Sequence, residues 1–288
     1  MTDAPIEAGL LCSYSLEATV KDIPALVAAG GAIPRGTVIS IPYLHDQPAE
    51  SRVAAAVALR RLGYDPMPHI AARRVRSADE LRAFLAAVRD AAQVDRVLVI
   101  AGDCDVAEGP YPDALSVIRG DLLAGHGIRT VGISGYPEGH PKIAAPALAR
   151  AMADKLAVLA AQGQAAEIAT QFAFDADPVV TWLEDLRGGG VTAPVRLGVP
   201  GPASVKTLLR FAALCGVGAS AKVLAKYGIS LTQLLNKAGP DRLMDTLSAR
   251  LTPAHGVVHA HFYPFGGVER TAAWIEAYAA KAGLKRAC

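Results

Sequence analysis

Residues 77–103, SADELRAFLAAVRDAAQVDRVLVIAGD, decide the fold class because they contain one complete helix followed by one buried strand. Ser77 and Glu80 form a capping box at the start of the helix, and apolar residues then recur at helical spacing from Leu81 to Val88. The segment Arg96–Asp103 begins with a short apolar run rich in β-branched residues, which predicts a strand covered on both faces. A helix that leads into such a strand indicates a parallel sheet built from repeated βα units.

The same alternation of short apolar runs and longer amphipathic, Ala-rich stretches extends along the chain. Eight strands are predicted, at Leu11–Glu17, Thr37–Ile41, Pro66–Ile70, Arg96–Asp103, Arg129–Ser134, Glu167–Phe174, Pro194–Val199 and Val257–Tyr263. A chain of 288 residues, 52% of them hydrophobic, is long enough for a barrel, which needs about 250 residues. We expect an α/β fold, a (β/α)8 TIM barrel, in a single catalytic domain over residues 1–288. An open doubly wound sheet is the alternative.

Local signals predict where three further helical regions lie. Asp177-Pro178 indicates a helix start with proline at the first helical position, and Gly188–Gly190 indicates its end. Another helix is expected near Ser204–Leu214. The residues between it and the last strand, Gly216–Ala254, are more than a loop needs and should form two or three extra short helices. We interpret them as an insertion in the barrel.

The charge balance and the amino-terminal sequence restrict the classes of partner. Lys and Arg number 29 against 27 Asp and Glu, a formal net charge of +2, and no basic run is long enough to follow a nucleic acid backbone. The opening residues, MTDAPIEAG, lack the order of a signal peptide, and no apolar stretch reaches the roughly 18 residues of a membrane span. We expect a cytoplasmic protein without nucleic acid or membrane partners, and homo-oligomer formation is left open.

Cysteine and histidine spacing supports neither a metal site nor a nucleophilic enzyme. The four cysteines are scattered without a CxxC pair, which favours reduced thiols over a zinc site or a disulfide framework. They are Cys12, Cys104, Cys215 and Cys288. No metal-ligand spacing occurs, so no metal is expected, and neither GxSxG nor GxGxxG is present.

Polar residues follow the predicted strands at the end where barrel enzymes gather their functional groups. Glu17 ends the first strand, and alternation places it inside the barrel with Ser13 and Ser15. A carboxyl group there is costly unless solvated or paired, which suits a general acid; an ion pair with an arginine at the rim is the alternative. Asp103 follows a strand and Gly102, which delivers its side chain to the rim, although an ordinary loop start would look the same.

The segment Gly135–Pro141, GYPEGHP, is the most specific motif of the chain. A permissive glycine, two prolines with fixed φ, an aromatic residue, an acid and a histidine are an unusual composition for a simple turn. It therefore predicts a ligand-binding loop after the fifth strand. Other polar residues at strand ends are Tyr43, His45, His69 and Gln171.

Several segments occur in an order that resembles methylenetetrahydrofolate reductases. They are Gly135–Pro141 (GYPEGHP), Thr170–Asp175 (TQFAFD), Gly198–Ser204 (GVPGPAS) with the residues after it, and His261–Tyr263 (HFY). The resemblance runs from Glu17 to the last strand and covers the catalytic barrel of that family. It implies a flavoprotein that reduces 5,10-methylenetetrahydrofolate to 5-methyltetrahydrofolate by a ping-pong route, with NAD(P)H reducing FAD before folate binds.

The resemblance also implies roles for individual residues. Glu17 matches the catalytic acid that assists opening of the folate imidazolidine ring. Asp103 matches the catalytic Asp near the flavin and the pterin, where it contacts both and tunes them electrostatically. Gln171 matches the glutamine that binds the pterin. The residues implied to bind the cofactor are His69, Gly102, Asp103, Tyr111, Tyr136, His140 and Lys155.

Three departures from the family pattern change the expected ligand contacts. Ala18–Lys21 replaces Phe-Phe-Pro-Pro, Ala101 replaces the Arg before Gly-Asp, and Gly266-Gly267 replaces Asn-Arg. The missing Arg removes a charge-assisted contact to the flavin phosphates, a bond of about 1.5–3 kcal/mol. The alternatives are therefore a flavin-independent reductase of the same substrate, a folate-dependent methyltransferase, or a folate-binding barrel without activity.

Overall fold

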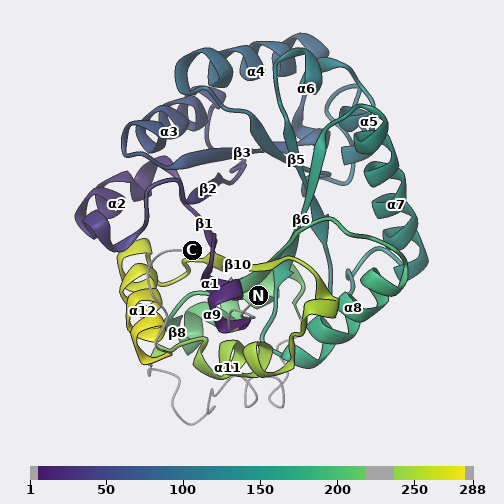
Figure 1. Ribbon diagram of the computed structural model, residues 1–288. Coiled ribbons are helices and arrows are strands. Elements are labelled where there is room, and N and C mark those ends of the chain that lie inside the picture. The colour runs from purple at the N-terminus through teal and green to yellow at the C-terminus, as the bar shows by residue number, and fades with distance from the viewer. Residues whose placement is uncertain (1–5, 218–236, 283–288) are drawn as a thin grey trace.

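The computed structural model describes residues 6–217 and 237–282, and its centre is a closed barrel of eight parallel strands inside a ring of helices (Figure 1). Around the barrel the strands follow the order β1-β10-β7-β6-β5-β4-β3-β2. Their bounds are β1 Ser15–Glu17, β2 Val38–Ile41, β3 Asp65–Ala71, β4 Arg96–Ile100, β5 Thr130–Gly135, β6 Ala165–Phe172, β7 Val195–Pro200 and β10 Val258–Tyr263. The predicted TIM barrel is confirmed, and each of the eight predicted strands overlaps an observed one.

Two strands are shorter than predicted by three residues or more. Leu11 belongs to helix α1 (Ile6–Leu11), so β1 begins only at Ser15, after Ser13 has adopted a left-handed φ of 54°. The fourth strand stops at Ile100, three residues before Asp103. In both cases the predicted segment extends beyond the hydrogen-bonded ladder, because periodicity alone does not show where the ladder begins or ends.

Helices follow the strands and pack their apolar faces on the outside of the barrel. Besides α1, they are α2 Ile23–Ala29, α3 Ala49–Arg61, α4 Ala78–Ala92, α5 Ala114–Ile118, α6 Leu122–Gly125, α7 Ala145–Ala161, α8 Ala176–Gly188, α9 Val205–Cys215, α11 Asp241–Arg250 and α12 Val268–Lys281. Short 3₁₀ turns are η1 Val20–Asp22, η2 Gly30–Ala32, η3 Ala72–Arg74 and η5 Pro253–His255.

The helix starts correct two details of the sequence analysis. Ser77 caps α4 by accepting a hydrogen bond from the Glu80 amide at 3.1 Å, but the Glu80 carboxylate accepts from the Arg76 amide and so completes only half of the predicted box. Helix α8 begins two residues before the predicted start, because Asp175 has the extended backbone of a cap and accepts from the Asp177 amide. Its predicted glycine stop is confirmed.

The predicted insertion, Gly216–Ala254, lies partly outside the described residues, at 218–236. Its described part contains α11 and a two-residue strand, β9 (Lys237–Ala238), that pairs antiparallel with β8 (Ala203–Ser204). One of the expected extra helices is thus present before the last strand.

The barrel interior consists of layers of different polarity. Val38, Met67 and Leu98 form the apolar middle layer, and a Cβ added to Gly132 would lie 2.5 Å from the Met67 Cε atom. A glycine in β5 therefore makes room for the methionine of β3. Above and below this layer the inward positions are polar.

The cysteines differ in part from expectation. Cys104 and Cys215 are free, whereas Cys12 is disulfide-bonded, so the expectation of reduced thiols is wrong at that position. Disulfide formation depends on the separation of two Cα atoms in space, which sequence spacing does not give. Within residues 6–217 and 237–282, no helix has the length and apolar character needed to cross a membrane.

Candidate functional site

Glu17 lies at the carboxyl end of β1 between two buried histidines. Its Oε1 atom is 3.9 Å from Nε2 of His69 on β3 and 3.9 Å from Nε2 of His261 on β10. The Glu17 side chain is 21% exposed, whereas those of His69 and His261 are 7% and 2% exposed. One carboxyl group therefore reaches solvent at the barrel mouth while two imidazoles flank one of its oxygens.

His69 is held in an apolar environment that keeps it neutral. Burial lowers its pKa to about 4, against the opposing effect of the Glu17 charge. Its Nε2 atom is buried without a hydrogen-bond partner among the described residues. Its backbone carbonyl accepts from the Arg52 guanidinium at 2.9 Å, and Arg52 itself lies over the rings of Tyr43 and Phe84. The strand end that carries His69 is thus fixed from outside the barrel.

His261 is part of a second set of contacts that the sequence analysis did not single out. Its Nδ1 atom is 2.8 Å from the hydroxyl oxygen of Ser15, which is fully buried on β1. The His261 ring packs edge-on against Tyr263, and the Tyr263 hydroxyl donates to the Thr170 carbonyl at 2.9 Å. Alternation along β10 places His261 inside the barrel, but in the sequence His261–Tyr263 serves only as one of the segments that carry the family resemblance.

Gln171 and the GYPEGHP loop line a small hollow beside this cluster. The hollow also contains Cys215 and Gly216 at the end of α9. Tyr136 and His140 pack edge-on with ring centroids 5.0 Å apart, and burial followed by the Lys142 charge lowers the His140 pKa. The Gln171 amide oxygen accepts from the Phe172 amide at 3.1 Å, which leaves its NH₂ group to donate to a ligand.

Electrostatic effects connect the hollow to Glu17. Burial raises the Tyr263 pKa well above its usual range, and the charges of Glu17, Cys215 and Tyr136 act in the same direction. Burial and the Glu17 charge also raise the pKa of the Cys215 thiol. The structure therefore brings the predicted residues of β1, β3, β5 and β6 together at one mouth.

Asp103 lies on the loop after β4, and its carboxylate belongs to a network of ion pairs. Its Oδ1 atom accepts from the Arg74 guanidinium at 2.9 Å, and the other side of Arg74 reaches Glu108 at 2.7 Å. Burial alone would raise the Asp103 pKa, but the hydrogen bond and charge of Arg74, together with the Asp103 backbone amide and the His45 charge, outweigh burial and the pKa is lowered. Gly102 before it has a φ of 94°, a conformation that favours glycine.

Two further residues implied to bind the cofactor, Tyr111 and Lys155, do not line the hollow. Tyr111 packs partly buried against the apolar core. Lys155 lies ten residues after the start of α7, about 15 Å along the helix axis. Burial lowers the Lys155 pKa, opposed by the charge of Asp113 at the start of α5.

Within the described residues, the loops after β3, β4 and β5 offer no unpaired Lys or Arg side chain to the diphosphate of FAD, although residues suited to its ring are present at the mouth. Arg73 donates to the carbonyls of Pro112 and Cys104, Arg74 and Arg76 pair with carboxylates, and Lys142 pairs with Asp105 at 2.9 Å. These are the four Lys and Arg residues of those loops, which lie wholly within the described residues. A diphosphate would have to displace one of these partners.

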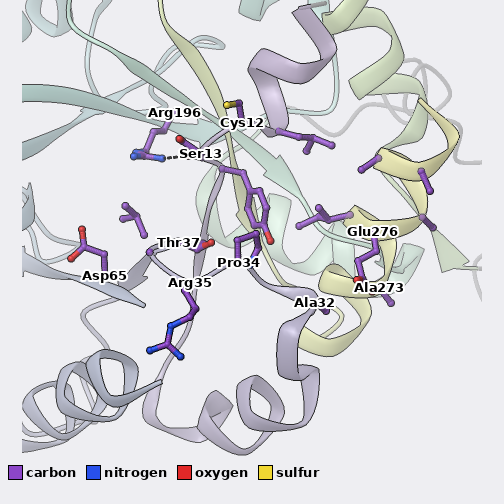
Figure 2. Close-up of a pocket in the computed structure, with 18 of the residues that line it drawn as sticks. Cys12, Ser13, Ala32, Pro34, Arg35, Thr37, Asp65, Arg196, Ala273 and Glu276 are labelled. Carbon is purple, nitrogen blue, oxygen red and sulfur yellow. Dashed lines mark hydrogen bonds between the residues drawn. The ribbon is translucent and has the colours of Figure 1, made fainter. Parts of the chain in front are cut away.

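A larger cavity lies at the opposite end of the barrel, beside the amino-terminal ends of β1 to β4 (Figure 2). Its volume is about 890 Å³. Figure 2 shows Arg196 linked to Ser13, with Thr37, Arg35 and Asp65 around the same space. None of the predicted site residues lines it. Across the described residues, no three His, Cys, Asp or Glu side chains converge so that they could hold a metal ion.

Comparisons with known proteins bear on the family and the fold of the chain. The family model described as methylenetetrahydrofolate reductase matches residues 43–277. A solved structure titled an uncharacterized protein from Clostridium thermocellum that binds two copies of 5-methyl-5,6,7,8-tetrahydrofolic acid superposes with a TM-score of 0.62 at 14% identity, covering 93% of each chain. A dihydropteroate synthase from Burkholderia cenocepacia gives a TM-score of 0.48 at 13% identity, covering 94% of this chain and 90% of that one. At such identities the first likeness shows the shared barrel fold.

Proposed function

The chain belongs to the methylenetetrahydrofolate reductase family, and from this premise we propose that it reduces 5,10-methylenetetrahydrofolate to 5-methyltetrahydrofolate with reducing equivalents from NAD(P)H. The observation that carries the proposal is the partly exposed carboxyl of Glu17 at the mouth of the barrel, next to two buried imidazoles. A carboxyl in this position can exchange protons with water and still face a bound substrate.

The reaction needs one proton and one hydride. Glu17 donates the proton to the folate nitrogen that leaves as the imidazolidine ring opens, and the remaining iminium carbon accepts the hydride. The products are 5-methyltetrahydrofolate and NAD(P)⁺, and Glu17 takes up a new proton from solvent. The Gln171 amide, which lines the hollow, is proposed to donate to the pterin, and Asp103 to bind the pterin from the adjacent loop.

The route of the hydride is the point on which two candidates differ. The family resemblance implies FAD as an intermediate carrier with ping-pong kinetics. The pairing of Arg73, Arg74, Arg76 and Lys142 favours the second candidate, direct transfer from NAD(P)H to folate in a ternary complex. We assign no step to a flavin.

Steady-state assays of the purified chain test both levels of the proposal. Methylenetetrahydrofolate-dependent oxidation of NAD(P)H without added flavin, with intersecting initial-rate plots, would support direct transfer. Activity that requires FAD, with parallel plots and the visible absorption of bound flavin, would support the flavin route. Absence of reduction under both conditions would reject the reductase function, and titration with 5-methyltetrahydrofolate would then test folate binding alone.

A further inference from the structure

We propose that His261 is a positioning residue for Glu17: it holds Oε1, so that the transferable proton lies on Oε2. This inference rests on the proposed function, because it specifies how the acid of that reaction is oriented. His261 stands outside the set of residues that the sequence assigned to catalysis or binding.

The geometry around the Glu17 carboxyl distinguishes its two oxygens. Both imidazole contacts, from His69 and from His261, are made to Oε1 and have the same length of 3.9 Å. This distance exceeds a hydrogen bond, and contacts of catalytic groups often shorten only when substrate binds. A carboxyl whose Oε1 accepts from ring N–H groups carries its own proton on Oε2.

The Ser15 hydroxyl is placed so that it can donate to the His261 tautomer that this arrangement needs. Its hydroxyl lies 2.8 Å from Nδ1, and when the hydroxyl donates, the ring proton resides on Nε2 and faces Glu17. Ser15 and His261 are opposite each other in the ladder of β1 and β10, so the contact is fixed by strand register. Both side chains are almost fully buried, which limits other orientations of the ring.

The groups that act on Glu17 come from several elements of the fold. His69 comes from β3, Tyr263 and His261 come from β10, and Cys215 comes from the end of α9. Burial holds His69 neutral and Tyr263 protonated at neutral pH, and it also favours the thiol form of Cys215. A change at His261 should therefore act on Glu17 without a second charge change nearby.

Two substitutions separate the two nitrogen positions of the imidazole. His261→Asn retains an amide near the Nδ1 position, in reach of Ser15, but leaves no group at the Nε2 position that faces Glu17. His261→Gln places an amide nitrogen near the Nε2 position. We expect kcat to fall about tenfold to hundredfold in His261→Asn with KM unchanged, and to stay within about threefold of wild type in His261→Gln.

The pH profile supplies a readout that a purely structural role would not change. An N–H donor at Oε1 favours the ionised carboxylate, so its loss should move the alkaline limb of kcat to higher pH in His261→Asn. His259→Asn is the matched control, because His259 precedes His261 on the same face of β10 and contacts the Gly9 carbonyl at 3.0 Å. Its kcat and pH profile should remain those of wild type.

Three results would overturn the inference: equal rates in both His261 variants, an unshifted alkaline limb, or the same loss in His259→Asn. If the His261 variants do not fold, Ser15→Ala replaces them, with a smaller fall in kcat and the same direction of shift expected, and an unchanged profile there also rejects the inference. Full activity of Glu17→Gln would instead reject the proposed acid and hence the proposed function.

Discussion

The two ends of the barrel interior use the same residue types in opposite ways. At the amino-terminal end Glu167 accepts from Arg196 at 2.9 Å, and Asp65 lies 2.7 Å from Arg96. At the carboxyl-terminal end, no Lys or Arg side chain contacts Glu17 among the described residues. Its nearest basic groups are the imidazoles of His69 and His261, each 3.9 Å away. The first end contains close ion pairs, and the second contains a carboxyl without a strong partner.

This difference is the physical reason for proposing that the chemistry takes place at the carboxyl-terminal end. A buried carboxylate with a guanidinium partner is held in one charge state, whereas a proton donor must change its charge state in every cycle. The larger cavity lies at the paired end, so volume alone would have pointed to the face opposite the proposed site. Four substitutions test the comparison, in order of decreasing expected effect.

Glu17→Gln should reduce kcat for folate reduction by about 10²- to 10⁴-fold, because a general acid contributes a factor of that size. The unfolding free energy should stay close to wild type, since no short ion pair is lost. Steady-state assays and urea denaturation measure the two quantities. Glu269→Gln, an exposed position on α12, is the control. A fall in stability with an unchanged rate would contradict the assignment.

Glu167→Ala should have the opposite profile. Removing one partner of a buried ion pair leaves the Arg196 charge uncompensated and lowers the unfolding free energy by about 3–5 kcal/mol. The kcat of the folded fraction should remain within about twofold of wild type. Urea denaturation gives the stability, and assays below the transition give the rate. A loss of stability below about 1 kcal/mol would show that the pair is not structural.

His69 predicts a pH dependence of stability. The unfolded chain binds a proton at this residue below pH 6.5, but the folded chain does so only below about pH 4. Folding therefore becomes less favourable as pH falls from 6.5 to 4, by up to about 3 kcal/mol from this group. In His69→Gln, the unfolding free energy, measured by denaturation at several pH values across this interval, should depend less on pH. An identical slope in the variant would mean that another group is responsible.

Gln171→Ala should have the smallest of the four effects. Loss of one hydrogen bond of about 0.5–1.5 kcal/mol to a bound ligand raises the dissociation constant roughly two- to twelvefold. Titration with 5-methyltetrahydrofolate at fixed salt and pH measures it. Stability should not change greatly, because the Gln171 amide bonds only to its neighbour Phe172 among the described contacts. Wild-type affinity would show that Gln171 does not bind folate.

Part of the site could be predicted because its signals are local. Glu17 was identified by alternation along one strand, and the GYPEGHP loop by its unusual composition. The start of α8 was predicted two residues late, because both Asp175 and Asp177 have cap-forming side chains and only backbone conformation decides between them. The place of Lys155 along α7 depends on where that helix begins, which a motif does not specify.

The sequence pattern favoured the barrel over an open doubly wound sheet, because eight apolar strands separated by amphipathic helices have few other ways to bury their faces. It also determined which end of the strands carries the predicted polar residues. Only the tertiary structure decided which of these residues meet. Ser15 and His261 are 246 positions apart in the chain and come into contact because the first and last strands close the barrel. Packing between separate loops and strands likewise decides the ion pairs of Arg74. It also leaves Nε2 of His69 without a hydrogen-bond partner among the described residues.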